Sequence, residues 1–312
     1  MLKIVESLEI IMNIFRIVVG VLVAFLSPYT RAQTAVVLGT DGGPLRVAPG
    51  QVVTFWMTGL TPTPSSGAKA MSTPFPTTLA GISATMTQAG GPKIPPVPII
   101  AVGKGAGLCM AEQCEGVVGV TVQIPYELLV EERIPGCAGC ITRPAWIVFS
   151  DSTNSKTLGP EILPYPDQIH VLAVTHGDGG IVTPSNPALV GEVIVMYASG
   201  LGYPKSLTSR LGLTTGDVTP SPPPDTPGAL SYDFRVNASP SQARLTTPDP
   251  YLLYLGMSPG SVGLYNANFV VPPLPDGLPE CDGISVSSNL TVTLVGATSF
   301  DGAAICVKNP GP

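Results

Sequence analysis

The stretch APGQVVTFWMTGL at residues 48–60 decides the fold, because the chain contains it twice. The second copy is LVGEVIVMYASGL at residues 189–201. In both copies a short run of β-branched and aromatic residues lies between glycines, which is typical of a strand bounded by turns. A separation of roughly 140 residues is too long for a solenoid repeat and suits a whole domain, so the sequence predicts two homologous domains in tandem. The matched residues are Gly50 with Gly191, Gly59 with Gly200, and Leu60 with Leu201.

Further matches occur in the same order in both halves. A turn signal precedes each copy, TDGG at residues 40–43 and GDGG at residues 177–180. Farther along, GVVGVTVQIP at residues 116–125 corresponds to GSVGLYNANFVVP at residues 260–272. The shared order indicates that a whole unit was duplicated, and not a single strand.

Composition predicts the fold class. The chain has 312 residues with 35 Gly and 35 Pro, and only 12% are charged, which disfavours long helices and supplies turns throughout. One segment, Tyr126–Glu132, has weak helical periodicity. We expect an all-β chain of two tandem Ig-like antiparallel β-sandwich domains. The strand-like segments are Val52–Met57, Val117–Ile124, Ala145–Phe149, Val193–Tyr197, Tyr232–Val236, Val262–Val271 and Leu290–Val295.

The boundary between the domains is expected at residues 163–167, where prolines at alternate positions favour an extended linker. The first domain then covers residues 33–165 and the second covers residues 166–312. The net charge of −6 leaves no strongly basic face, so we expect no nucleic-acid partner.

Residues 1–32 have the pattern of a signal peptide. Arg16 precedes an uninterrupted apolar run at Ile17–Leu26, and TRA at residues 30–32 suits signal peptidase. The run is only about half as long as a membrane-spanning helix requires, so we expect cleavage and no membrane span afterwards. Met12 stands where a signal of ordinary length would begin, and we expect translation to start there. The predicted location is outside the cell or in the cell envelope.

Export changes the interpretation of the six cysteines, because thiols pair in oxidising compartments. A bridge between Cys281 and Cys306 would staple the C-terminal strand of the second domain. The cysteines of the first domain could form two local disulfides, pair across the sheet, or hold zinc; export favours disulfides over zinc. They are Cys109, Cys114, Cys137 and Cys140.

The repeated stretch, together with LYNANFVVP at residues 264–272, carries a resemblance to a family. It resembles the Solibacter-type uncharacterised C-terminal domain, an Ig-like module of secreted acidobacterial proteins related in style to IPT/TIG domains. The resemblance covers most of the mature chain and is strongest over residues 186–296. The family usually has Y-Q-I-N-V-x-V-P here, so Asn266 departs from it and Asn268 matches it. The resemblance implies export and a fold, and it implies no activity or cofactor.

One catalytic pattern occurs in the sequence. GMSPG at residues 256–260 fits the nucleophile-elbow pattern with Ser258 as the nucleophile. An elbow requires a following helix and a later histidine, whereas a strand-like segment follows here and both histidines precede it. We therefore predict no catalytic residue and no enzyme, and a serine hydrolase is the third alternative.

Metal-binding patterns are also weak. His170 and His176 could share one face of a continuous strand, but no carboxylate cluster accompanies them in sequence. Asp41 and Asp178 recur at equivalent Asp-Gly turns, and each supplies a single carboxylate where calcium needs several oxygen ligands. We predict no metal ion and no cofactor.

The remaining predictions concern binding. Trp56 and Trp146 lie among Val, Phe and Ile, where core packing is the default. Tyr203, Tyr251 and Tyr254 could contact sugars from loop edges, which leaves a carbohydrate-binding or adhesion module as the second alternative.

Two long polar loops, Thr61–Thr78 and Thr219–Gly228, are the preferred contact regions, because loops on rigid sandwiches often carry binding. The function expected is a non-enzymatic, exported Ig-like interaction or structural module whose partner is an unknown protein or glycan at the cell surface.

Overall fold

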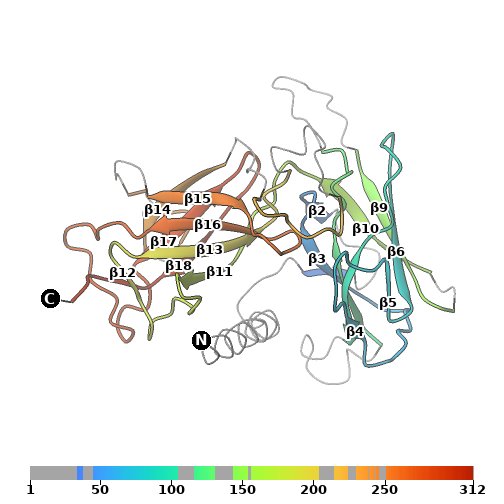
Figure 1. Cartoon of the computed structure of the whole chain (residues 1–312), viewed down its shortest axis with the longest axis horizontal. Helices are drawn as coiled ribbons and strands as arrows, with labels where there is room; N and C mark the ends of the chain where they lie inside the picture. The colour runs from blue at the N-terminus through green and yellow to red at the C-terminus, as the bar shows by residue number, and fades with distance from the viewer. Residues whose placement is uncertain are drawn as a thin grey trace, which may run out of the picture. The chain divides into compact units, whose positions relative to one another are not determined.

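The computed structural model describes residues 34–37, 45–104, 116–130, 143–153, 156–203, 214–223, 230–237, 239–242, 244–245 and 251–311 (Figure 1). Gln33–Pro312 forms one compact unit. The predicted signal peptide and several predicted site residues lie outside the described residues. These residues are Asp41, Cys109, Cys114, Cys137 and Cys140.

In the described residues, the first sandwich contains ten strands. They are β1 (Thr34–Val37), β2 (Leu45–Val47), β3 (Val52–Met57), β4 (Ala68–Lys69), β5 (Thr78–Leu79), β6 (Ile82–Gln88), β7 (Ile99–Lys104), β8 (Val118–Gln123), β9 (Ala145–Ser150) and β10 (Lys156–Pro164). One sheet has the order β1-β3-β8-β7-β4 and the other has the order β2-β10-β9-β6-β5. Apolar side chains at alternate positions fill the space between the sheets, where the rings of Phe55 and Phe149 lie 5.3 Å apart.

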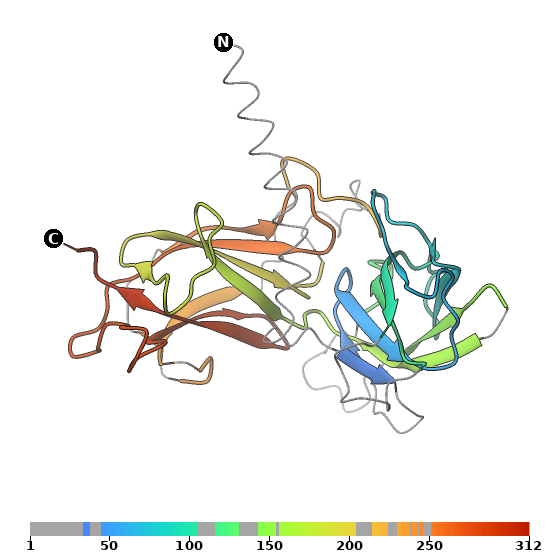
Figure 2. The same cartoon turned by 90° about the horizontal axis from the view of Figure 1, so that it is seen from below.

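The described part of the second sandwich contains nine strands. They are β11 (His170–His176), β12 (Ala188–Leu189), β13 (Val193–Ser199), β14 (Ser231–Val236), β15 (Leu252–Met257), β16 (Tyr265–Val270), β17 (Leu290–Val295), β18 (Phe300–Ile305) and β19 (Val307–Lys308). One sheet has the order β11-β13-β16-β15, another has the order β14-β17-β18, and β12 pairs with β19. Figure 2 shows β15 and β16 (orange) in one layer and β17 and β18 (red) in the other. Between them the rings of Phe234 and Phe269 lie 5.7 Å apart.

The two sandwiches share the order of their central strands, although β1 pairs parallel with β3 and β11 pairs antiparallel with β13. The central pair β3 and β8 places Val52 opposite Gln123, and the central pair β13 and β16 places Val193 opposite Val270, in the same antiparallel register along its length. The strands β6, β7 and β9 correspond to β14, β15 and β17, since β7 and β15 pair with β8 and β16, and β6 and β14 pair with β9 and β17. The predicted fold class, an all-β chain of two tandem Ig-like antiparallel sandwiches, is confirmed by this arrangement.

The glycine turn before the central strand is also built twice with the same hydrogen bonds. In the first copy Gly50 N donates to Ile124 O at 2.8 Å, and Ala48 N donates to Gln51 Oε1 at 2.9 Å. In the second, Gly191 N donates to Val271 O at 2.9 Å, and Leu189 N donates to Glu192 Oε2 at 2.8 Å. Both glycines have a positive φ, 79° and 84°, which explains the residue type.

Several predicted elements differ from the structure in detail. The strand predicted at Val262–Val271 begins at Tyr265, because the preceding residues form a turn. The weak helical candidate is also wrong where the structure describes it, because residues 126–130 form a turn and a loop. Within the described residues the structure contains no helix, and therefore none long and apolar enough to cross a membrane.

Candidate functional site

Several buried and part-buried contacts lie where residues 123–128 meet residues 200–203 and 214–217, a region we call the joint. Gly216 N donates to the buried Gln123 Oε1 at 2.6 Å, and Tyr126 N donates to Thr215 Oγ1 at 2.9 Å. Thr215 Oγ1 in turn donates to Glu127 Oε2 at 2.6 Å. Because these groups are largely removed from water, breaking one bond would leave a partner unsatisfied.

Three tyrosines fill the joint. Tyr126, from the first sandwich, packs into the core of the second. Tyr265 donates its hydroxyl to Gly202 O at 2.5 Å, and Tyr203 donates its hydroxyl to Leu128 O. Burial raises the pKa of Tyr126, Tyr203 and Tyr265, so all three hydroxyls stay protonated at any ordinary pH.

The linker between the sandwiches is held on both sides. Tyr165 N donates to Val47 O at 2.8 Å, and Gln168 N donates to Gly200 O at 2.7 Å. The buried carboxylate of Asp167 accepts hydrogen bonds from Ala297 N and Ser299 N, both at 2.7 Å. A proline-rich linker could have been a free spacer, and here its polar groups are bonded to both domains.

Glycines allow the close approach at the joint. A Cβ on Gly200 would lie 1.9 Å from Gln168 O, and a Cβ on Gly202 would lie 1.9 Å from Pro166 O. No side chain other than hydrogen fits against a carbonyl at that distance. The glycine that ends the second copy of the repeated stretch is therefore required by packing as well as by backbone conformation.

The two loops nominated for binding differ in structure. Residues 61–78 contain β4, which pairs with β7, and Phe75 N donates to Gly216 O at 3.2 Å. Met71, in the same loop, is 94% exposed. Of the second loop, residues 219–223 are described, and Thr219 is buried, with its N donating to Ser261 O at 2.7 Å. The first loop is thus part of the fold as well as an exposed surface.

A disulfide joins Cys281 and Cys306, whose Cα atoms lie 5.3 Å apart. It ties the segment before β17 to the residue between β18 and β19. The bridge predicted to staple the C-terminal strand is therefore present in the structure.

The two histidines occupy opposite ends of β11, about 20 Å apart along the strand. His170 Nδ1 lies 3.6 Å from Asp301 Oδ2, and His176 Nδ1 lies 2.6 Å from Glu192 Oε1. They are too far apart to act on one metal ion or one substrate. Sequence reasoning missed both carboxylates because the tertiary fold, and not proximity in sequence, brings them to the histidines.

Neither the turn aspartate nor the serine pattern builds a reactive site. Asp178 Oδ1 accepts a hydrogen bond from Gly180 N at 2.8 Å, as in an Asx turn. Ser258 lies in the turn from β15 to β16, so a strand follows it where an elbow has a helix. Among the described residues, no three His, Cys, Asp or Glu side chains are placed to hold a metal ion.

The prediction that both tryptophans pack in the core is wrong. Trp146 is 36% exposed, because Ala145 and Ile147 on either side of it point into the core and the alternation of a strand turns it outward. Trp56 is half-buried on the outer face of its sheet, where its ring lies against Gly119. Neither is a core residue.

The tyrosines nominated for sugar contact are held by the protein. Tyr203 bonds across the joint, Tyr251 packs against Phe234 with ring centroids 6.3 Å apart, and Tyr254 donates its hydroxyl to Met257 O at 2.9 Å. All three are partly buried. The structure does not bring them together as one platform.

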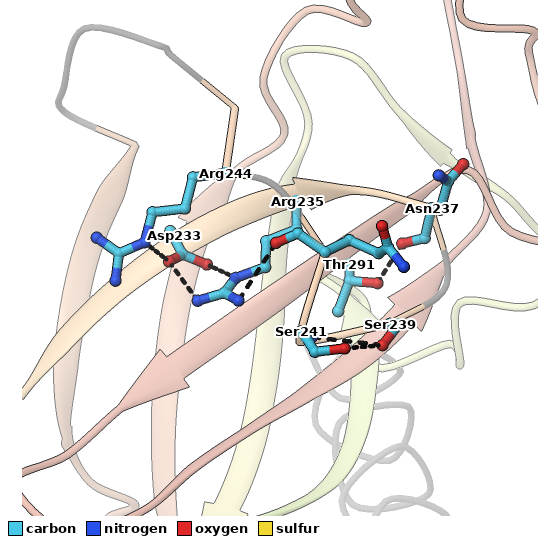
Figure 3. A network of polar contacts seen from close by, with 8 residues as sticks. Asp233, Arg235, Asn237, Ser239, Ser241, Arg244 and Thr291 are labelled. Atoms are coloured by element: carbon cyan, nitrogen blue, oxygen red, sulfur yellow. Dashed lines mark hydrogen bonds and ion pairs between the residues drawn. The ribbon is translucent and has the colours of Figure 1, made fainter.

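A polar network that sequence reasoning did not single out lies on the outer face of β14 (Figure 3). Asp233 Oδ1 accepts from Arg235 Nε at 2.8 Å, and Asp233 Oδ2 accepts from Arg235 Nη2 at 3.0 Å and from Arg244 Nε at 2.7 Å. The Asp233 hydrogen bonds, opposed in part by burial, raise the pKa of Arg235. Asp233 and Arg235 stand two apart in a predicted strand, which places them on one face; nothing in the sequence pointed to Arg244.

Comparison with known proteins adds no family. No family model matches the chain, and no curated protein matches it. Among solved structures, the chain is similar to one described as "Anomalous substructure of Titin-A168169", at 10% identity and a TM-score of 0.21, with 86% of this chain and 95% of that chain covered. Another, described as "BspA_C_WT", has 8% identity and a TM-score of 0.19, with 85% and 95% covered. Such TM-scores carry no argument about function, and the Solibacter-type resemblance stays a prediction.

Proposed function

We propose that this protein is an exported, non-enzymatic module that acts through its surfaces and holds two Ig-like sandwiches together as one structural element. The joint is the observation that carries the proposal. Buried hydrogen bonds to Gln123, buried tyrosines and a linker bonded at Asp167 support one fixed arrangement, because satisfied buried polar contacts rigidify the structure around them. The disulfide between Cys281 and Cys306 supports export, because such bonds persist in oxidising compartments.

Two measurements test this proposal. N-terminal sequencing of protein recovered from the medium or envelope should begin after Ala32, and a mature chain found only in the cytosol would refute export. Limited proteolysis should leave residues 164–170 uncut in the wild type and cut them in Gln123→Leu, which removes the acceptor of Gly216 N. Equal cutting of both proteins would refute a structural role for the joint.

The predicted contact loops belong to the same proposal. Met71 is almost fully exposed in the first loop, and Phe75 N ties that loop to Gly216, close in sequence to the start of the second loop. We propose that a partner contacts this combined surface. Because the first loop contributes β4 to the fold, the suitable test is a point change: Met71→Asp should weaken capture of a cell-surface partner without lowering the melting temperature. Unchanged capture would refute the loop assignment.

A further inference from the structure

The outer face of the β14-β17-β18 sheet carries a band of charged and aromatic side chains. From the β14 edge of the sheet to β18 it consists of Arg244, Asp233, Arg235 and Phe300, which we call the arginine band. Arg244 forms an antiparallel bridge with Arg235, and the guanidinium carbon of Arg235 lies 6.0 Å from the centroid of the Phe300 ring on β18. The band thus crosses from the edge over three strands, about 14 Å.

The two arginines differ in how many of their guanidinium nitrogens are hydrogen-bonded within the protein. Arg235 gives Nε and Nη2 to Asp233 and Nη1 to Gln242 O at 3.3 Å, and its side chain is only 13% exposed. Arg244 gives only Nε, and its side chain is 62% exposed. Figure 3 shows its two Nη atoms pointing away from Asp233, and no described residue accepts from them. The carboxylate therefore orients a guanidinium whose outer edge has no acceptor among the residues that the structure describes.

The charge of the band favours an anion. Two guanidinium groups face one carboxylate, which leaves a local charge of about +1 in a chain of net charge −6. Arginine keeps its charge at all ordinary pH values, and its planar fork matches a carboxylate with two parallel hydrogen bonds.

The surroundings favour a sugar over a peptide. Phe300 is 52% exposed and offers a flat ring to the C–H face of a sugar. A peptide that joined the sheet beside Arg244 would need a free edge at β14, but Arg244 and Leu245 already occupy that edge, with Leu245 N donating to Phe234 O at 2.8 Å. The sheet surface beneath the arginine band is also closed to a ligand at Thr293 on β17, because that residue is fully buried.

We propose that the arginine band binds an acidic polysaccharide. The Nη atoms of Arg244 pair with a sugar carboxylate, and the Phe300 ring packs against the apolar face of a neighbouring sugar unit. This inference rests on the proposed function, because it names a partner class for the same non-enzymatic module.

The test is calorimetric titration of the full chain with polygalacturonate fragments at low salt, beside neutral dextran. We expect binding of the acidic polymer alone, a loss of about 10-fold or more for Arg244→Gln, and a smaller loss for Phe300→Leu. The matched control is Arg143→Gln, the same charge change at an exposed arginine of the first sandwich, which should leave affinity unchanged.

Several outcomes would overturn the inference. They are no binding of the acidic polymer, equal binding of dextran, equal loss in Arg143→Gln, or equally tight binding of poly-glutamate that depends on Arg244. Melting temperatures of both variants within a degree or so of wild type would show that the fold is intact. Failure here leaves the export and joint tests untouched, so the two proposals can fail separately.

Discussion

The repeated turn stands in two different environments in the two sandwiches. In the first, Gly50 faces the joint, where an added Cβ would lie 2.1 Å from the Tyr126 ring, and the capping side chain is the buried Gln51. In the second, Gly191 has open space around it, and the capping side chain is the partly exposed Glu192, paired with His176. A neutral amide fits the buried copy because a buried carboxylate would need a compensating charge. The backbone of the turn is duplicated, and the side chain follows the local polarity.

The far end of the same strand shows the reverse. Gly59, which ends the first copy, is exposed, whereas Gly200, which ends the second, is buried against the linker. The joint therefore joins the beginning of the first repeated stretch to the end of the second. Each copy keeps one turn packed against other parts of the protein and one turn exposed at the surface, which supplies matched variants.

The largest effect is expected from Gly200→Ala. Its Cβ would meet Gln168 O at 1.9 Å, in addition to the strain of a φ of 74°. We expect a loss of about 4 kcal/mol in the free energy of unfolding. The matched change Gly59→Ala, at a φ of 84° on the surface, should cost about 1 kcal/mol. Urea unfolding measures both, and equal losses would remove the distinction between the two turns.

Removing the disulfide should affect one sandwich. Replacing Cys281 and Cys306 by serine opens a loop with a sequence separation of 25 residues, which corresponds to about 3.5 kcal/mol. Calorimetry should show the second sandwich unfolding at a lower temperature, with the first unchanged or following only through the joint. A variant that melts like the wild type would show that the bridge has no structural role.

Exchanging the two capping side chains tests the polarity argument. Gln51→Glu places a carboxylate in the buried turn and should cost about 3 kcal/mol at neutral pH. Glu192→Gln keeps the hydrogen bond to Leu189 N and should cost less than about 1 kcal/mol. The comparison would fail if the two substitutions had the same effect in chemical denaturation.

The smallest effect is expected for the loss of stability in acid. Asp301 lies in the second sandwich, so this effect is expected in that sandwich. Burial raises the pKa of Asp301, but contacts with His170 and hydrogen bonds from Val171 N and Gly302 N outweigh it and hold the pKa below its usual value. A lowered pKa contributes stability above the unfolded value, near 4, and that stability is lost as the pH falls through the folded value. Asp301→Asn should therefore be less stable at neutral pH and lose less on acidification below about pH 4. Parallel acid titrations of unfolding, if superimposable, would contradict this.

Sequence reasoning reached the fold because its signals are local. The repeated glycines and alternating apolar residues identify the strand, and β3 and β17 have the bounds that were predicted. Trp146 was misassigned because residue type was given more weight than the alternation with Ala145 and Ile147. Because side chains alternate between the two faces of a strand, the burial of Ala145 and Ile147 predicts that Trp146 points outward.

The candidate sites could not be predicted from local sequence patterns. The joint depends on Gln123 and Gly216, and the arginine band depends on Arg244, whose partners are fixed by strand pairing and domain contact. No local pattern records such pairings, because the same residues are ordinary surface polar groups in any other arrangement. Only the Asp233 and Arg235 pair had a signal, through its spacing on a strand.

The central claim is that the two copies form a single structural element through the joint. Residual dipolar couplings of backbone amides in both sandwiches measure this directly. We expect one alignment tensor to fit the amides of β3 and β8 together with those of β13 and β16. Two clearly different tensors in the wild-type protein would contradict it.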